Sequence, residues 1–456
     1  MINNGGLLEF MEPGSTISAH RRKNARANRL SPEDRNAHDW YRFVLSFPPH
    51  LVRDYVQRFN LDSNKCVLDP FAGTGTTLVE CKKLAIPGVG IEANPMAHFA
   101  SQIKTDWNID PNGLAEHSTF IAESARAELK ATGIEDDLPS YSLWSDGINE
   151  QYRTLPDDAF KLLLKDSISP RPLHKVLVLR DTLEAHRDER YYQHERLALA
   201  KALVSSISNL HFGPEVGVSP PKLDAPVISS WLEGIRSMTN DLHNLRSFKD
   251  VPTKIHYGDA RHMIEILEPA SIDAVITSPP YPNEKDYTRT TRLESVILGF
   301  MNDRQGLQEL KRRLMRSNTR NVYKGDDDDQ WVASHLEIQR IADEIEARRI
   351  ALGKTSGFER LYAKVTKLYF GGLKRHLADL RRVLRPGAHL AYVVGDQASY
   401  LRVMIRTGHL LGDIAQSLGY ELVGIDLFRT RLATATKEQL NEEVVVLRWP
   451  GCLAGS

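Results

Sequence analysis

Hydrophobic and polar positions alternate early in the chain between short apolar runs and longer amphipathic stretches. The pattern predicts a strand over 65–69, a helix over 76–84, a second strand over 88–92 and a second helix over 94–105. Strands that alternate with crossover helices are typical of a parallel sheet. This part of the chain therefore predicts an α/β fold.

The alternation stops near residue 108, and strands resume only after residue 250. Between these points the pattern predicts mainly helix and loop, with helices over 194–211 and 226–246. A long helix is expected to end at Arg385-Pro386-Gly387. Further strands are predicted over 253–257, 272–277, 389–394, 420–427 and 443–449. With the first two strands they predict a mostly parallel sheet of seven strands.

The changes in pattern also predict how the chain is organised. We expect a flexible basic arm over 1–37, the first part of the sheet domain over 38–109, a mainly helical insertion over 110–250, and the second part of the sheet domain over 251–456, which contains a charged, basic insertion at 283–357. Either insertion is a candidate for the region that recognises a substrate.

Charge is balanced overall but not locally. The 456 residues include 59 Lys and Arg and 59 Asp and Glu, which excludes a uniformly basic nucleic-acid binder. The stretch 304–324, however, has seven basic residues and a single acid, Glu309. Such a run predicts contacts with the phosphates of DNA or RNA, and the alternative interpretation is a solvated helix face.

Three features bear on location and on metals. The three cysteines, Cys66, Cys81 and Cys452, are scattered and odd in number, which excludes a disulfide framework and favours a reducing cytoplasm. No apolar run approaches the roughly 18 residues of a membrane span, and the first residues do not resemble a secretory signal. The sixteen histidines show no metal-ligand spacing. We expect a cytoplasmic protein with no membrane contact and no metal.

The turn between the first strand and the first helix is rich in glycine. Its sequence, Asp69-Pro-Phe-Ala-Gly-Thr-Gly-Thr-Thr77, lets the backbone approach a ligand beside a helix N-terminus. It is not a dinucleotide fingerprint, because Leu78 stands where a third glycine is required, and it is not a P-loop. Glu92, at the end of the next strand, can bind a ribose diol. The pattern predicts a ligand that contains a nucleoside.

A second motif, Ser278-Pro279-Pro280-Tyr281, follows the strand that ends at Thr277. The prolines have no N–H group and leave carbonyls exposed, the serine offers a hydroxyl acceptor, and the tyrosine offers a flat face. Together these groups can hold a planar group that carries an amine. The segment beginning at Ser219 repeats the letters Ser-Pro-Pro, but no strand precedes it, and we interpret it as a plain loop.

In combination, the two motifs resemble those of the class I S-adenosylmethionine-dependent DNA amino-methyltransferases of bacterial restriction-modification systems. That family has a DPFxGxGTT turn and a (D/N/S)PP(Y/F/W) loop. The resemblance covers roughly 38–108 and 251–450. It implies a Rossmann-like methyltransferase sheet, S-adenosylmethionine as cofactor and double-stranded DNA as partner, and it admits a cognate restriction endonuclease as a second partner.

The resemblance also assigns roles to residues. Ser278, Pro279, Pro280 and Tyr281 would be catalytic and would hold the target base. The cofactor would be bound by Phe71, Gly73 and Gly75 at its methionine end, by Asp69 near the sulfonium or amino group, by Glu92 at the ribose and by Asp259 at the adenine amine.

The serine form of the loop is most typical of enzymes that methylate N4 of cytosine, whereas aspartate is more typical of adenine-N6 enzymes. We therefore expect methyl transfer to cytosine N4 in duplex DNA, by direct displacement after base flipping. Three alternatives stay open: an adenine-N6 methyltransferase, an RNA guanine-amine methyltransferase, and a non-catalytic DNA-binding subunit. Both motifs are intact, which argues against the last of these.

Overall fold

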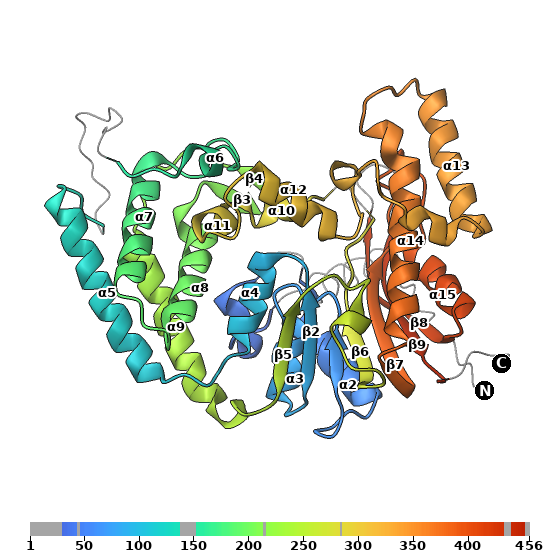
Figure 1. Ribbon diagram of the computed structural model, residues 1–456, viewed down its shortest axis with the longest axis horizontal. Helices are drawn as coiled ribbons and strands as arrows, with labels where there is room; N and C mark the ends of the chain where they lie inside the picture. The colour runs from blue at the N-terminus through green and yellow to red at the C-terminus, as the bar shows by residue number, and fades with distance from the viewer. Residues whose placement is uncertain are drawn as a thin grey trace, which may run out of the picture.

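The computed structural model describes residues 30–42, 46–136, 152–212, 216–282, 285–432 and 439–451. Most of the predicted basic arm therefore lies outside the described residues. At the centre is a seven-stranded sheet with the strand order β5-β2-β1-β6-β7-β9-β8 (Figure 1). The strands are β1 Val67–Asp69, β2 Gly88–Glu92, β5 Thr253–Tyr257, β6 Ile272–Thr277, β7 Leu384–Gly395, β8 Glu421–Leu432 and β9 Gln439–Arg448.

Five neighbouring strands of this sheet, from β5 to β7, run parallel to one another. β9 runs antiparallel to both of its neighbours, β7 and β8. The predicted α/β fold with a mostly parallel sheet of seven strands is confirmed, and the sheet is that of a Rossmann-like class I methyltransferase.

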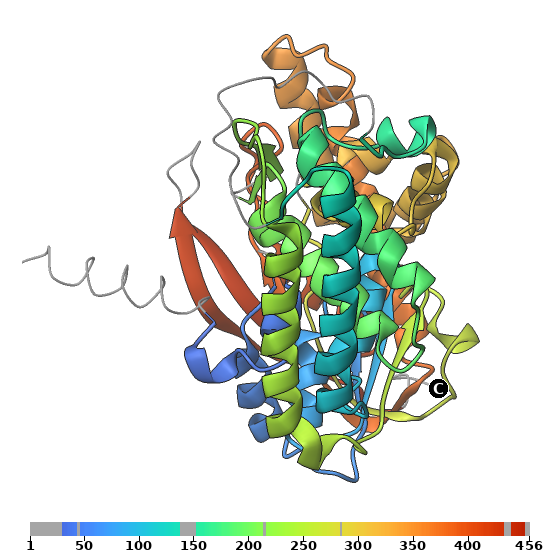
Figure 2. The same cartoon turned by 90° about the vertical axis from the view of Figure 1, so that its left-hand side faces the viewer.

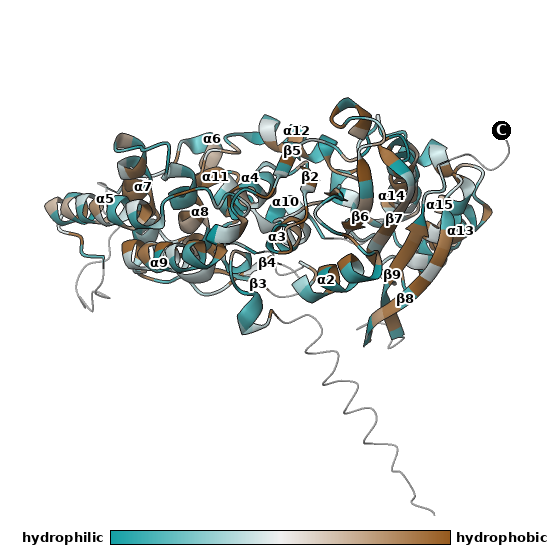
Figure 3. Ribbon diagram, turned by 90° about the horizontal axis from the view of Figure 1, so that it is seen from below, coloured by the Kyte–Doolittle hydropathy of each residue, from teal (hydrophilic) through white to brown (hydrophobic). Residues whose placement is uncertain are grey.

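Helices cover both faces of the sheet because successive residues of a buried strand point to opposite sides. Val67 and Ile276 pack in one apolar cluster with α2 (Pro49–Arg58) and Cys81 of α3 (Thr76–Lys83). Leu68 and Val275 pack in another with α14 (Tyr362–Leu380) and α15 (Thr407–Ser417). Figure 3 shows hydrophobic residues along β8 and β9 and on parts of the surrounding helices.

The predicted insertion at 110–250 is mainly helical and packs beside the β5 edge of the sheet, where α4 (Pro95–Lys104) joins it (Figures 1 and 2). Its helices share one apolar cluster with each other and with α4. The helix expected over 194–211 ends earlier, because α8 gives way to a π-helical turn over 203–207 and then to a short hairpin. The elements are α5 Pro111–Ala131, α6 Asp157–Phe160, α7 Pro170–Ala185, α8 Tyr192–Ala202, α9 Val227–Leu245, β3 Leu210–Phe212 and β4 Val216–Val218.

The described part of the second insertion contains four α-helices and several tight turns. Three of them lie above the carboxyl ends of the parallel strands, and α13 packs against α14 (Figure 1). Their bounds are α10 Tyr287–Thr290, α11 Arg292–Ile297, α12 Arg304–Arg313 and α13 Leu336–Ala351. Among the described residues, no helix has the length and apolar character needed to cross a membrane.

A second boundary also differs from the sequence-based prediction. Arg385-Pro386-Gly387 was expected to end the long helix, but α14 ends at Leu380 and the triplet lies inside β7. Gly387 has a φ of 87°, and the pairing with β6 shifts register between Leu384 and His389. Proline and a left-handed glycine are tolerated in a strand at such a bulge.

Two threonine hydroxyls fix the end of β1 and the start of α3 to the end of β6. The Thr277 hydroxyl donates to the Asp69 carboxylate at 2.6 Å, and the Thr77 hydroxyl donates to the Ile276 carbonyl at 3.1 Å. All of these groups are buried. The glycine-rich turn is therefore fixed against the start of the Ser-Pro-Pro-Tyr loop, although some 200 residues separate the two motifs in the sequence.

This contact predicts a stability effect. At pH 8, Thr277→Val should lower the free energy of unfolding by about 1.5–3 kcal/mol, the contribution of a hydrogen bond to a charged group. Denaturant unfolding is the measurement. Thr366→Val is the matched control, because the Thr366 hydroxyl is also buried but donates only to the carbonyl four residues earlier in α14. Equal losses in the two variants would show that the contact between Thr277 and Asp69 contributes nothing of its own.

Candidate functional site

A cavity of about 560 Å³ opens at the carboxyl ends of the parallel strands. Here the connection after β1 leads to β2 on one side and the connection after β6 leads to β7 on the other, and this is the position at which open α/β sheets bind ligands. Eight of the ten predicted site residues line the cavity: Phe71, Gly73, Glu92, Asp259, Ser278, Pro279, Pro280 and Tyr281. The other two, Asp69 and Gly75, are buried beside it.

Both glycines of the turn have a left-handed backbone, with φ of 53° at Gly73 and 83° at Gly75. Gly73 lines the cavity and donates its N–H to Glu92 at 2.8 Å. Gly75 precedes α3, and a Cβ there would lie 2.9 Å from the Cβ of Ser101 in α4. The first glycine therefore shapes the cavity wall, whereas the second allows α3 and α4 to approach closely.

Glu92 ends β2 and reaches back under the turn. Its two carboxylate oxygens accept N–H groups from Gly73, at 2.8 Å, and from Asn94, at 2.7 Å. Burial raises the pKa of Glu92 to about 7, although these backbone N–H groups act in the opposite direction. A carboxylate has about four lone-pair positions, so Glu92 retains acceptors for two hydroxyl groups in the cavity.

Asp69 does not reach the cavity wall. Its carboxylate accepts from the Thr277 hydroxyl and from the N–H of Phe71 at 3.2 Å. Burial raises the pKa of Asp69 to about 6, and these partners lower it. Asp69 therefore fixes the turn to β6, and it was expected instead beside the methionine end of the cofactor.

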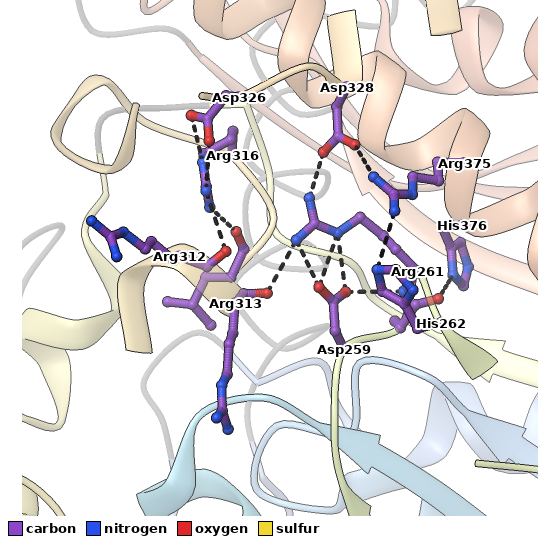
Figure 4. Close-up of polar contacts among 12 residues, drawn as sticks. Asp259, Arg261, His262, Arg312, Arg313, Arg316, Asp326, Asp328, Arg375 and His376 are labelled. Carbon is purple, nitrogen blue, oxygen red and sulfur yellow. Dashed lines mark hydrogen bonds and ion pairs between the residues drawn. The ribbon is translucent and has the colours of Figure 1, made fainter. Parts of the chain in front are cut away.

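Asp259 lies on the wall formed by the segment after β5. The Arg261 side chain donates to its carboxylate from Nε at 3.0 Å and from Nη2 at 2.7 Å (Figure 4). Burial acts to raise the pKa of Asp259, but the Arg261 guanidinium holds it below its usual value. Asp259 is therefore an ionised acceptor.

The Ser-Pro-Pro-Tyr loop forms the opposite part of the cavity. The Ser278 hydroxyl donates its proton to the carbonyl of Val393 in β7 at 3.1 Å, so its lone pairs remain as acceptors. The Tyr281 ring packs directly on Gly395, where a Cβ would lie 2.8 Å from the ring. Burial and the nearby Glu442 raise the pKa of Tyr281, which keeps the phenol neutral. Ser219, in the similar Ser-Pro-Pro segment, lies outside this cavity and contacts His211.

Much of the remaining cavity wall was not predicted from the sequence. β8 and β9 contribute a bidentate ion pair, in which Arg429 donates to Glu442 at 2.6 and 2.9 Å. The second insertion contributes Leu314 and Met315. Neither the ion pair nor the apolar pair forms a local sequence motif. The one sequence signal for the ion pair was the spacing of Arg429 and Arg431, which places both side chains on one side of a strand.

Comparison with known proteins shows that the chain is similar to DNA methyltransferases. The model of the N6/N4 methyltransferases, described as DNA methylase, matches residues 17–102. The type II methyltransferase M.BsoBI of Geobacillus stearothermophilus is 25% identical over 91% of this chain and 85% of its own length. The type II methyltransferase M.AvaI of Nostoc sp. is 23% identical over 93% of this chain and 88% of its own length. Both alignments necessarily include most of the helical insertion.

An rRNA methyltransferase structure from Streptomyces viridochromogenes, aviRa, covers 91% of this chain at 10% identity, with a TM-score of 0.31.

The strand order and the cavity at the carboxyl ends of the strands are those of the class I methyltransferase fold. The family match over 17–102 and the similarity to two type II methyltransferases support a DNA methyltransferase of the N4/N6 family with S-adenosylmethionine as methyl donor, as the motifs predicted. The residues fit this cofactor, because the cavity is of suitable size for a nucleoside with an amino-acid tail and presents the Glu92 and Asp259 carboxylates. Within the described ranges, no group of three or more metal-ligating side chains is present.

If Glu92 binds the ribose hydroxyls of the cofactor, its raised pKa predicts that cofactor binding depends on pH. The carboxylate form can accept hydroxyl groups on both oxygens, and protonation removes part of that capacity. The dissociation constant of S-adenosylhomocysteine should therefore rise about tenfold between pH 8 and pH 6, through a pKa near 7. Calorimetric titration measures it. Glu92→Gln should bind about tenfold more weakly at pH 8 and lose this dependence. If Glu92→Gln keeps the same pH profile, another group is responsible.

Proposed function

We propose that this chain transfers a methyl group from S-adenosylmethionine to the exocyclic N4 amine of cytosine in duplex DNA, by direct displacement on a flipped-out base. The supporting observation is that one cavity is lined both by the glycine-rich turn with Glu92 and by the Ser278–Tyr281 loop. A cofactor and a base that entered this cavity from opposite ends would meet at the loop.

On this proposal, the turn and its neighbours hold the cofactor. When bound, S-adenosylmethionine supplies a methyl group already activated as a sulfonium. Glu92 accepts the ribose hydroxyls, Asp259 accepts the adenine amine, and Phe71 and Gly73 shape the methionine end. Asp69 and Gly75 act through packing, because neither lines the cavity.

Ser278 and Pro279 hold the target amine. The lone pair of an aromatic amine is delocalised into the ring, which makes it a poor nucleophile. Hydrogen bonds from the NH₂ group to the Ser278 hydroxyl and the Pro279 carbonyl draw the nitrogen toward sp³ geometry and restore that lone pair. What remains is alignment at near-attack distance: the bond between sulfur and the methyl carbon would break, S-adenosylhomocysteine would leave, and the methylated amine would release one proton to solvent, so no cysteine nucleophile is required.

Tyr281 provides a surface for the flipped base. Extracting a base from the duplex costs a few kcal/mol, and stacking on an aromatic ring returns roughly 1–3 kcal/mol. The ring of Tyr281 is set by its contact with Gly395. The uncharged serine at the first loop position favours cytosine, and adenine N6 is the other outcome of the product test below.

The basic run 304–324 provides phosphate contacts on this proposal, but not through all of its cations. Lys311 is paired with Asp286 at 2.8 Å, and Arg316 is buried and paired with Asp326 at 2.8 Å. The exposed cations in and beside α12 are Arg304, Arg312, Arg313, Arg320 and Lys324. These are the residues that can neutralise phosphates.

Ser278→Ala should lower the turnover number about tenfold or more, while cofactor affinity stays near that of the wild type. The reason is that the lost acceptor matters most when the amine gains positive charge. Methyl transfer to duplex DNA from labelled cofactor is the measurement, with cofactor binding in parallel. Ser219→Ala is the matched control and should be nearly silent. If the two variants behave alike, the catalytic role of the loop is wrong.

The modified base decides between the two amines. DNA from a methylation-free host that expresses the chain should contain N4-methylcytosine. Detection of N6-methyladenine instead would overturn the cytosine proposal and leave the roles of the loop residues intact. Absence of both from DNA would refute the proposed activity.

The exposed cations should contribute to the salt dependence of DNA binding. Replacing Arg312, Arg320 and Lys324 with glutamine should reduce the slope of log affinity against log salt by roughly 0.9 per phosphate contact, or about 2.7 in total. Fluorescence anisotropy at several salt concentrations measures the slope. Lys311→Gln should leave it unchanged, because that ammonium is already paired with Asp286. An unaltered slope in the triple variant would mean that this surface does not face DNA.

A further inference from the structure

The Arg261 guanidinium contacts three separate parts of the chain (Figure 4). It binds the carboxylate of Asp259, it donates from Nη1 to Asp328, and Nη2 approaches the carbonyl of Arg313 at 3.3 Å. The side chain is only 10% exposed. Its donors are therefore used within the protein, in contacts that reach from the segment after β5 to the second insertion.

The contact with Asp259 determines how that carboxylate faces the cavity. Nε lies 3.0 and 3.1 Å from its two oxygens, Nη2 lies 2.7 Å from one, and the Arg261 backbone N–H lies 2.9 Å from the other. A bidentate arginine–carboxylate pair is planar and fixes the carboxylate plane. A carboxylate has about four lone-pair positions, and these bonds already use most of those of Asp259. Arg261 therefore sets the direction in which the remaining lone pair of Asp259 points.

The hydrogen bond to the Arg313 carbonyl affects a second part of the cavity wall. The carbonyl held by Arg261 precedes Leu314 and Met315, which both line the cavity. The Arg313 side chain lies over the ring of Tyr257, at the end of β5, with its guanidinium 5.3 Å from the ring centroid. One guanidinium therefore contacts both the acid of the cavity wall and the backbone that leads into the apolar residues Leu314 and Met315.

Asp328 gives this arrangement a rigid support. Its carboxylate also accepts from Arg375 of α14 at 3.2 Å. A Cβ on Gly371 would lie 1.8 Å from the Asp328 carbonyl oxygen, so α14 and the backbone at Asp328 are in direct contact. The glycine is required for this approach. The anchor of Arg261 is thus fixed to the main helix of the sheet domain.

We propose that Arg261 is a positioning residue for the adenine end of the cofactor, which acts through the Asp259 carboxylate and through the backbone of Arg313. The inference rests on the proposed role of Asp259 in accepting the adenine amine. It adds the residue that aims this acid and joins it to the basic insertion.

The test compares two ligands that differ only in that amine. They are S-adenosylhomocysteine and its purine-riboside counterpart, in which hydrogen replaces the 6-amino group. Calorimetry with the full chain gives the ratio of their dissociation constants. In the wild type the amine should improve binding roughly tenfold or more, as expected for a hydrogen bond to a charged group. Arg261→Gln should reduce the ratio to about two or less, and Arg261→Lys should restore it only in part, because lysine lacks the planar fork.

Two further variants separate the possible failures. Arg375→Gln also removes a partner of Asp328 but does not touch Asp259, and it should keep the wild-type ratio. Asp259→Ala removes the acceptor and should reduce the ratio to about one. If the wild type does not discriminate between the two ligands, or Asp259→Ala still does, the role of Asp259 is wrong. If Asp259→Ala loses the discrimination but Arg261→Gln weakens both ligands equally, Arg261 only stabilises the fold and this inference is overturned.

Discussion

The contact between Asp69 and Thr277 is the constraint on which the site depends. The Ser278–Tyr281 loop and the glycine-rich turn follow different strands, and a long helical insertion separates them in the sequence. Parallel pairing of β1 with β6 brings their ends together, the Thr277 hydroxyl fixes the last residues of the two strands to each other, and the Thr77 hydroxyl fixes the start of α3 to Ile276. The cost of burying the Asp69 carboxylate, seen in its raised pKa, is offset only while these donors are in place.

This arrangement explains how so large an insertion is tolerated. The helices of 110–250 pack in an apolar cluster that they share with α4 and α11, and they meet the sheet at its β5 edge, on the far side of β2 from the contact between β1 and β6. The second insertion is different in kind, because Leu314 and Met315 form part of the cavity wall. The first insertion adds helices at one edge of the sheet, whereas the second contributes residues to the cavity.

Much of this organisation could be predicted from the sequence because it is local. A strand, a turn with two glycines and a helix form one continuous segment, and so do β6 and the Ser278 loop, so both motifs and the seven strands were recognisable. Contacts across the fold could not be predicted in this way. The burial of Asp69 away from the cavity, the pairing of Lys311 and Arg316 with acids, and the Arg429–Glu442 wall all depend on partners distant in sequence. The bulge at Arg385-Pro386-Gly387 was misassigned because proline followed by glycine also ends helices.

The reversed direction of β9 has a consequence for how such enzymes diverge. The functional groups that belong to the parallel strands lie at the strand ends, where the connection to the next helix begins. A change in sequence length at these ends therefore also alters the crossover connection. Glu442 stands instead near the beginning of β9 and pairs across the hairpin with Arg429 of β8. This wall of the cavity can therefore change in sequence and in hairpin length without any change in the glycine-rich turn or its strands. The fold makes two walls of a single cavity structurally independent of each other.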